Sequence, residues 1–375
     1  MAEWKEYRLE QLLSYEQPTS YIVESTDYDD KYKTPVLTAG KSFILGYTDE
    51  QEGIYNTLPV IIFDDFTTAS QYVNFPFKVK SSAMKILTAN TELVLPRFIY
   101  YRMQIIEFDH STHKRYWIQQ YSKIKVSIPP LPEQQRIVSR IEELFSQLDS
   151  GIETLRKAKQ QLAVYRQAVL KEAFGNLREK RPIREMSSTV TSGSRGWAQY
   201  YADSGARFIR ITDLTRDRIR LKNDSIQYVA LPDNVEGKRS RLLADDVLIS
   251  ITADLGSIAL VPKDIPEAYI NQHIAMVRFQ NPNQGEFMAW YLKSEHGQKD
   301  LLKNKRGGGK LGLGLDDIRD TLVPVVDDKT AQSIVARIDS RLSVCDNIEL
   351  TVDAALQQAE ALRQSILKQA FERGL

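Results

Sequence analysis

The stretch that decides the fold is residues 132–174, which read PEQQRIVSRIEELFSQLDSGIETLRKAKQQLAVYRQAVLKEAF. Apolar side chains recur every three or four positions, the spacing that places them on one face of an α-helix. Pro132 suits a first turn, and Gly175 can supply the left-handed conformation that ends many helices. At ~1.5 Å per residue the helix would be about 65 Å long, too long for one compact domain to cover, so a partner helix is expected. The predicted apolar stripe is Ile137, Ile141, Leu144, Leu148, Ile152, Leu155, Leu162, Tyr165, Val169 and Ala173.

The partner helix is encoded at the end of the sequence. At one constant shift and without a gap, Ile137 matches Ile334, Asp149 matches Asp346, and the segment 166–174 resembles 363–371. The chain therefore reads as globular unit, helix, globular unit, helix. Because each half has its domain before its helix, the two helices are expected to pair antiparallel about a pseudo-twofold axis. The predicted helix-packing residues are Ile137, Ile141, Leu148, Leu155, Leu162, Ile334, Ile338, Leu342, Leu362 and Ile366.

Composition sets wide bounds. A chain of 375 residues allows two or three domains, and 42% hydrophobic with 26% charged residues is typical of a soluble globular protein. A formal charge of +1 argues neither for nor against nucleic acid, since cations can be concentrated locally. No apolar run approaches the ~18 residues that span a bilayer, and the N-terminus does not read as a signal peptide, so we expect a cytoplasmic protein. The single cysteine, Cys345, falls in the second stripe and is expected to be buried.

The predicted fold class is α+β, with two duplicated α/β domains joined by the long helices. The predicted boundaries are 1–128 for the first domain, 129–175 for the central helix, 176–325 for the second domain and 326–375 for the last helix. In the first domain, short apolar runs such as 58–63, 73–79 and 84–87 predict strands, and 95–106 predicts a helix. The second domain repeats this order, with Phe287 and Trp290 in the places of Phe98 and Tyr101.

Loop residues differ between the halves, and several loops are basic. Residues 303–310 hold four cations and three consecutive glycines, which let backbone N–H groups approach phosphate. Lys and Arg neutralise phosphates, and an Arg fork can pair with guanine, so these loops are candidate DNA contacts. The candidate DNA-binding residues are Lys41, Lys114, Arg115, Tyr116, Ser194, Arg195, Arg210, Thr212, Lys305, Arg306, Gly307, Gly308, Gly309 and Lys310.

Catalytic and metal motifs are incomplete. Gly40, Lys41 and Ser42 resemble the end of a phosphate-binding loop, but Pro35 stands where its first glycine is needed. His110 and His113 have the spacing of metal ligands without a third ligand nearby. Neither an amino-methyltransferase motif nor a glycine-rich loop suited to S-adenosylmethionine is found. The sequence therefore predicts a protein without catalysis or metal of its own.

The duplicated helix carries a family resemblance. The entry PLPEQQRIV at 130–138 and the exit LKQAFERG at 367–374 resemble the specificity subunit of type I restriction-modification systems. That resemblance implies two target recognition domains, each reading one half of a split DNA site, with helices that act as spacers and hold two modification subunits. It also implies that S-adenosylmethionine belongs to the modification subunits, and ATP and Mg to a restriction subunit if one is present.

Two other classes remain open at this point. A structural adaptor could use the coiled coil to join proteins, with the globular units as protein-binding modules. A DNA-cleaving enzyme is a third possibility, which the incomplete metal and nucleophile motifs disfavour. The basic, glycine-rich loops disfavour the adaptor.

Overall fold

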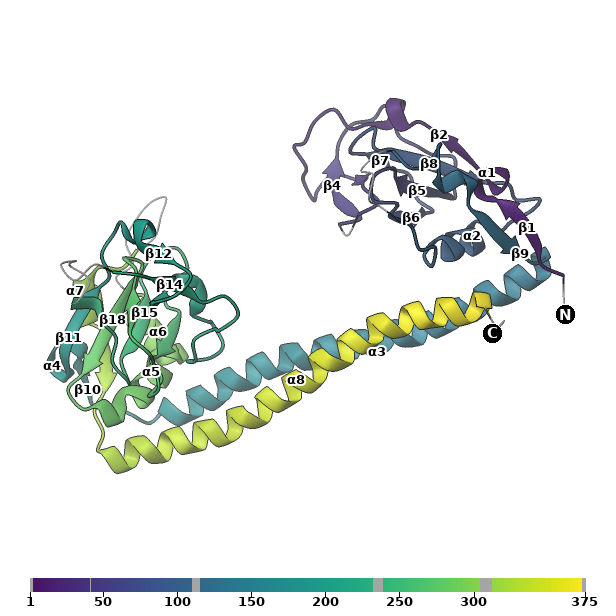
Figure 1. Cartoon of the computed structure of the whole chain (residues 1–375). Helices are drawn as coiled ribbons and strands as arrows, with labels where there is room; N and C mark the ends of the chain where they lie inside the picture. Colours follow the sequence, from purple (N-terminus) through teal and green to yellow (C-terminus); the bar gives the residue numbers. More distant parts are fainter. Residues whose placement is uncertain (1–2, 41, 110–114, 232–238, 304–311, 373–375) are drawn as a thin grey trace. The chain divides into compact units, whose positions relative to one another are not determined.

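The computed structural model describes residues 3–40, 42–109, 115–231, 239–303 and 312–372 (Figure 1). The chain divides into two compact units. Unit 1 comprises residues 1–155 and 354–375, and unit 2 comprises residues 156–353. Each unit therefore contains one globular domain and a part of both long helices.

Both long helices are present. α3 spans Leu131–Phe174 and α8 spans Asp328–Glu372, so the predicted pair of long helices is confirmed. Pro132 lies in the first turn of α3, as expected. Gly175 does not adopt the left-handed conformation that we expected of it. Among the described residues, the glycines with positive φ are Gly53, Gly196, Gly205 and Gly256. Instead α3 ends in a turn in which the Leu177 N–H donates to the Phe174 carbonyl at 3.2 Å.

Within each unit the helices pack antiparallel. In unit 1 the start of α3, with Ile137 and Ile141, shares a buried cluster with the end of α8, with Ile366 and Ala370. In unit 2 the end of α3 shares a cluster with the start of α8. Of the predicted packing residues, those that are buried are Ile137, Ile141, Leu162, Ile334, Ile338, Leu342 and Ile366. Leu148 and Leu155 are half-buried.

Two stripe predictions were wrong. Leu362 is 50% exposed and Tyr165 is 48% exposed. The next residue in each case, Arg363 or Arg166, bonds instead to an aspartate of the facing helix. An arginine directed toward its carboxylate partner thus displaces the apolar side chain from the seam. Cys345 is buried as predicted, and burial raises the pKa of its thiol.

The globular domain of unit 1 contains two small sheets. An antiparallel sheet has the order β2(Leu13–Glu16), β8(Met84–Ala89), β5(Val60–Asp64), β6(Ser70–Val73). A mixed sheet has the order β4(Ile44–Thr48), β3(Thr34–Leu37), β7(Lys78–Val79), with β3 and β7 parallel. A two-stranded ribbon joins β1(Lys5–Arg8) to β9(Lys125–Ile128), and the helices are α1(Leu9–Leu12) and α2(Pro96–Met103). The predicted strand 73–79 was wrong: the chain forms β6 and β7 with Pro76, which has no N–H to donate, between them.

Unit 2 repeats this topology, which confirms the predicted duplication. Its antiparallel sheet is β11(Ser187–Ser192), β18(Ile274–Phe279), β15(Val247–Ser250), β16(Ile258–Leu260). Its mixed sheet is β12(Tyr201–Ala202), β14(Gln227–Val229), β13(Ala206–Ile209), β17(Ala268–Ile270), with β13 and β17 parallel. The ribbon is β10(Lys180–Pro182) with β19(Leu322–Pro324). The helices are α4(Ile183–Met186), α5(Gly285–Lys293), α6(Glu295–Leu301) and α7(Leu315–Arg319).

Equivalent aromatic contacts join each domain to the long helices of its unit. In unit 1 the rings of Phe98 on α2 and Phe371 on α8 meet edge to face with centroids 5.2 Å apart. In unit 2 Phe287 on α5 and Phe174 on α3 meet in the same way at 5.5 Å. Such pairs add to the stabilisation from burial alone. In the part of the chain that the structure describes, no helix combines the length and the apolar character needed to span a bilayer.

Candidate nucleic-acid interface

One edge of the mixed sheet in unit 2 gathers candidate residues. β13 and β17 run parallel with Ile209 beside Ile270, so Arg210 and Asn271 leave the sheet at the same edge. The Gly193 N–H donates to the Asn271 carbonyl at 3.2 Å. A Cβ at Gly193 would lie 1.9 Å from the Ile270 carbonyl oxygen, so only glycine permits this approach. The structure therefore brings two predicted segments to one edge of the sheet. One contains Ser194 and Arg195, and the other contains Arg210 and Thr212.

The cations at this edge differ in what they contact. Arg195 and Thr212 are exposed. Arg210 donates to the carbonyl oxygen of Ser225 at 2.9 Å and to its hydroxyl at 3.2 Å, and its own N–H donates to Asp213. Arg210 therefore fixes the shape of its loop. Arg239, which we did not predict, is exposed and donates to the Ser194 hydroxyl at 3.4 Å.

A polar cluster adjoins this edge and was also missed from the sequence. The Thr252 hydroxyl lies 2.6 Å from Nδ1 of His273, and Nε2 of Gln272 lies 2.8 Å from Nε2 of that ring. Thr252 also pairs with Gly312, the first described residue after the glycine-rich segment. The available signal was the polar run Asn271–His273 between two buried strands. Lys305, Arg306, Gly307, Gly308, Gly309 and Lys310 lie outside the described residues.

The corresponding edge of unit 1 is built in the same way. β3 and β7 are parallel, and the Lys80 N–H donates to the Leu37 carbonyl at 3.1 Å where both strands end. Lys80, another residue missed from the sequence, is exposed there. The predicted Lys41 follows β3 closely in sequence but lies outside the described residues, as does Lys114.

The prediction that Tyr116 is a surface contact was wrong. Tyr116 is fully buried, with its ring centroid 4.9 Å from that of Phe108. Its backbone N–H donates to the Asp65 carbonyl at 2.9 Å, and the Asp65 carboxylate pairs with Lys85 at 3.2 Å, where both side chains are 1% exposed. This core anchors the neighbouring Arg115, which is exposed and lies 5.9 Å from the Phe66 ring centroid.

The two basic segments rejoin the domains at equivalent places. After segment 110–114, Tyr116 bonds to the residue that follows β5. After segment 304–311, the Leu313 N–H donates to the carbonyl of Ile251, which follows β15, at 3.0 Å. Since β5 and β15 hold the same position in the two sheets, the residues that follow the two basic segments bond to equivalent strand ends.

The described residues offer binding groups and no complete catalytic set. Among them, no three His, Cys, Asp or Glu side chains lie close enough to hold a metal ion. His110 and His113 lie outside the described residues. Guanidinium, hydroxyl, amide and imidazole groups at one edge suit contacts to phosphates and base edges.

The fold and these edges define a class: a protein with two duplicated α/β domains and two long helices. In each unit, one domain packs on an antiparallel part of both helices. Comparison with known proteins gives the family. Residues 1–162 and 206–358 match the family described as type I restriction modification DNA specificity domain. The chain belongs to this family.

Similar proteins agree with this assignment. The chain is 31% identical over 381 residues to the Type I restriction enzyme EcoR124I/EcoR124II specificity subunit of Escherichia coli, which covers 95% of this chain and 90% of that protein. It is 24% identical to the EcoBI specificity subunit of Escherichia coli, over 65% of this chain and 57% of that protein.

Two solved structures share the fold. One chain, described under "Structural basis underlying complex assembly and conformational transition of the type I R-M system", has a TM-score of 0.73, with 16% identity and full coverage of both chains. The HsdS subunit from Thermoanaerobacter tengcongensis has a TM-score of 0.50 and 16% identity, covering 99% of this chain and 97% of that chain.

Proposed function

We propose that this chain is the sequence-specific DNA-binding subunit of a type I restriction-modification complex. Each globular domain reads one half of a bipartite DNA target, and the long helices set the separation between the halves. The chain carries out no catalysis itself. Its 31% identity to a type I specificity subunit across nearly the whole chain supports this role.

The observation that carries the proposal is the duplicated sheet edge. In each unit a parallel strand pair, β3 with β7 or β13 with β17, ends beside the point where a basic segment rejoins the domain. Cations at this edge can neutralise phosphates, while the polar groups that differ between the units can read different bases. The DNA contacts are therefore proposed to lie at Arg115 and Lys80 in unit 1, and at Arg195, Arg239 and Thr212 in unit 2.

Catalysis belongs to partner subunits in this proposal. Two modification subunits would bind S-adenosylmethionine and methylate one base in each half-site, and a restriction subunit would bring ATP and Mg. Exposed apolar side chains on the parts of both long helices within unit 2 are candidate contacts for a modification subunit. They are Val164, Tyr165, Val344, Ile348 and Leu350.

Mapping of methylated bases in cells that carry this chain with its modification subunit tests the function. The expected result is a split motif with a fixed, non-specific gap. A second measurement is the affinity of the purified chain for random duplex DNA as a function of salt concentration. If the chain contacts phosphates, the logarithm of the binding constant should fall steeply and linearly with the logarithm of the salt concentration. If the chain fails to bind DNA at every salt concentration and also leaves methylation unchanged, it is an adaptor instead.

A further inference from the structure

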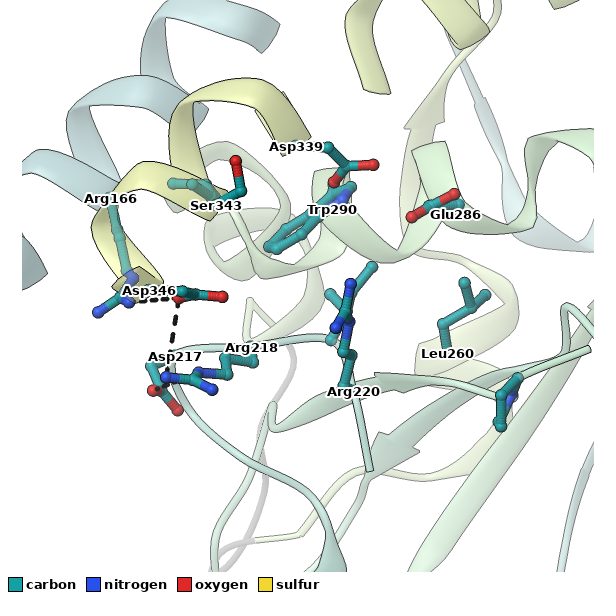
Figure 2. Close-up of a pocket in the computed structure, with 13 residues that line it drawn as sticks. Arg166, Asp217, Arg218, Arg220, Leu260, Glu286, Trp290, Asp339, Ser343 and Asp346 are labelled. Atoms are coloured by element: carbon teal, nitrogen blue, oxygen red, sulfur yellow. Dashed lines mark hydrogen bonds and ion pairs between the residues drawn. The ribbon is translucent and has the colours of Figure 1, made fainter. Parts of the chain in front are cut away.

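The two units contain equivalent pockets between the short domain helix and the long helices. In unit 2 a cavity of about 310 Å³ lies between α5, α8, the end of α3 and the segment 217–220 (Figure 2). Unit 1 has its pocket between α2, α3 and α8. Matched positions line both: Glu286, Trp290, Asp339, Leu342, Ser343, Asp346 and Arg166 in unit 2 correspond to Arg97, Tyr101, Glu142, Phe145, Ser146, Asp149 and Arg363 in unit 1.

The chain itself supplies a guanidinium group to the pocket of unit 1. Arg97 on α2 pairs with Glu142 on α3 at 2.8 Å. The same guanidinium lies 4.6 Å from the ring centroid of Tyr72, a distance at which a cation is attracted to an aromatic face. An arginine side chain, held by a carboxylate of the long helix, is thus the group that this place in the fold accommodates.

The pocket of unit 2 has a carboxylate where unit 1 has that arginine. Glu286 takes the position of Arg97 and Asp339 the position of Glu142, so two acids face each other across α5 and α8 (Figure 2). Burial raises the pKa of Glu286, and the nearby Asp339 and Asp245 raise it further, whereas Arg220 and Lys263 act in the opposite direction. Burial also raises the pKa of Asp339. Both shifts mean that the two negative charges are incompletely compensated.

Trp290 is a second polar group in this pocket. The residue is only 6% exposed, and its indole N–H makes no hydrogen bond of standard geometry among the described residues. The indole nevertheless lowers the pKa of Asp339, so its N–H is directed toward that carboxylate. A buried donor whose bond is incomplete is unusual in a well-packed core, and the Asp339 oxygens can accept further hydrogen bonds.

The remaining cations of the pocket do not balance these acids. Arg166 and Arg218 already contact Asp346 and Glu349. Arg220 is exposed and forms no ion pair within 4.0 Å in the described part of the chain. Arg220 and Lys263 therefore act on these acids only at a distance, which leaves both carboxylates able to accept a further cation.

We propose that the unit 2 pocket binds the guanidinium group of an arginine side chain from an associated protein. The carboxylates of Glu286 and Asp339 accept hydrogen bonds from the fork of N–H donors, a geometry that suits guanidinium better than ammonium. Trp290, Leu260 and Leu342 cover the alkyl stem. The bound arginine occupies in unit 2 the place that Arg97 occupies in unit 1, and the site does not depend on DNA binding.

Calorimetry on the full chain with N-acetyl-arginine amide, agmatine and N-acetyl-lysine amide tests the site. The arginine amide should bind, and more tightly than the lysine amide. The double variant Glu286→Gln, Asp339→Asn should weaken its binding by about tenfold or more, since each charge-assisted hydrogen bond is strong. Glu360→Gln, which alters an exposed carboxylate of α8 in unit 1, is the control and should leave binding unchanged.

A second variant distinguishes loss of the binding site from loss of folding. Glu286→Arg restores the arrangement of Arg97 with Glu142, so it should abolish binding of the arginine amide while raising the melting temperature. Absence of binding to the unaltered chain, or binding that survives both the double variant and Glu286→Arg, would overturn the proposal. Binding of agmatine without binding of the arginine amide would assign the site to a free guanidine instead of a protein side chain and would also overturn it.

Discussion

Arg166 on α3 and Asp346 on α8 form an ion pair at 2.5 Å, and the same pairing recurs between Arg363 on α8 and Asp149 on α3. Both pairs join equivalent positions of the duplicated helix, with the roles of α3 and α8 exchanged. Lys159 and Asp353, paired at 2.7 Å, lie in the same antiparallel register as both. The three ion pairs, one in unit 1 and two in unit 2, thus share one antiparallel register of α3 with α8.

Loss of Arg166 should destabilise unit 2. Its side chain is 7% exposed and lies between Asp346 and Glu349, so Arg166→Ala leaves partly buried carboxylates without this partner. The expected cost is about 3 kcal/mol. Urea unfolding measures it, with Arg136→Ala as the matched control: Arg136 pairs with Glu133 on the surface of α3, and its loss should cost no more than about 1 kcal/mol. Equal effects of the two variants would contradict the assigned role of Arg166.

Lengthening both helices together should lengthen the gap in the DNA target. Four residues inserted after Lys157 and four after Ala354 keep Arg166 level with Asp346 and Arg363 level with Asp149. The insertion adds about 6 Å, at ~1.5 Å per residue, which is close to two base pairs at about 3.4 Å each. Methylome sequencing should show both half-sites unchanged and the gap longer by one or two base pairs. Insertion into α3 alone puts the Arg363–Asp149 pair out of register with the Arg166–Asp346 and Lys159–Asp353 pairs and serves as the comparison. An unchanged gap with full activity would mean that the helices do not set the distance.

Unit 2 should show a distinctive pH dependence through Lys293. Burial lowers the pKa of Lys293 to about 8, and its ammonium donates to the Thr215 carbonyl at 2.8 Å. Between about pH 8 and the ordinary lysine pKa of 10.5, the unfolded chain binds the proton that the folded chain has released, so the free energy of unfolding rises with pH. The total gain is roughly 3 kcal/mol, at 1.36 kcal/mol per unit of pKa shift. Lys293→Met should remove this rise, which denaturant unfolding at several pH values measures. A rise of the same size in the variant would assign it to other groups.

The arginines at the unit 2 sheet edge should contribute to DNA affinity. Arg195→Ala and Arg239→Ala are each expected to lower the salt slope by about 1 if the side chain contacts a phosphate. A contact to a base would instead cost ~1 to 3 kcal/mol and relax one position of the motif. Binding isotherms at several salt concentrations distinguish the two. Arg181, exposed on β10 and 3.5 Å from Glu179, provides the control. Affinity and slope unchanged in both edge variants would place the DNA elsewhere.

The two domains should act as independent readers. Exchange of residues 182–325 for the equivalent unit of another such chain leaves α3, α8 and their ion pairs in place. One half-site should change while the other and the gap stay the same, which methylome sequencing shows. Alteration of both half-sites would contradict separate reading.

Features with a regular period could be predicted from the sequence. The stripe from Ile137 to Ala173 and its copy predicted the two helices and their pairing, because helical spacing and internal repetition are visible in the amino-acid sequence. The orientation of the Arg166 and Arg363 side chains toward the facing helix could not be predicted in this way. It depends on an aspartate of the opposite helix, and no local pattern records that partner, so Tyr165 and Leu362 were wrongly placed in the seam.

The candidate site was predicted less completely than the helices. Tyr116 stands next to basic residues and reads as a surface aromatic, yet the buried pair Lys85 and Asp65 draws it into the core. The His273 cluster forms only because β17 ends and β18 begins beside Thr252, a relationship set by the pairing of β18 with β15. Both cases depend on contacts between segments far apart in the sequence.

The contribution of α8 to unit 1 has a genetic consequence. Ile366, Leu367 and Ala370 complete the core of the domain that residues 1–128 form, and Phe371 packs on Phe98. A stop codon shortly after the codon for Ala354 would therefore spare every residue of the second recognition domain and damage the first. Mutations in the codons for residues 366–371 should therefore alter the half-site read by the domain of residues 1–128.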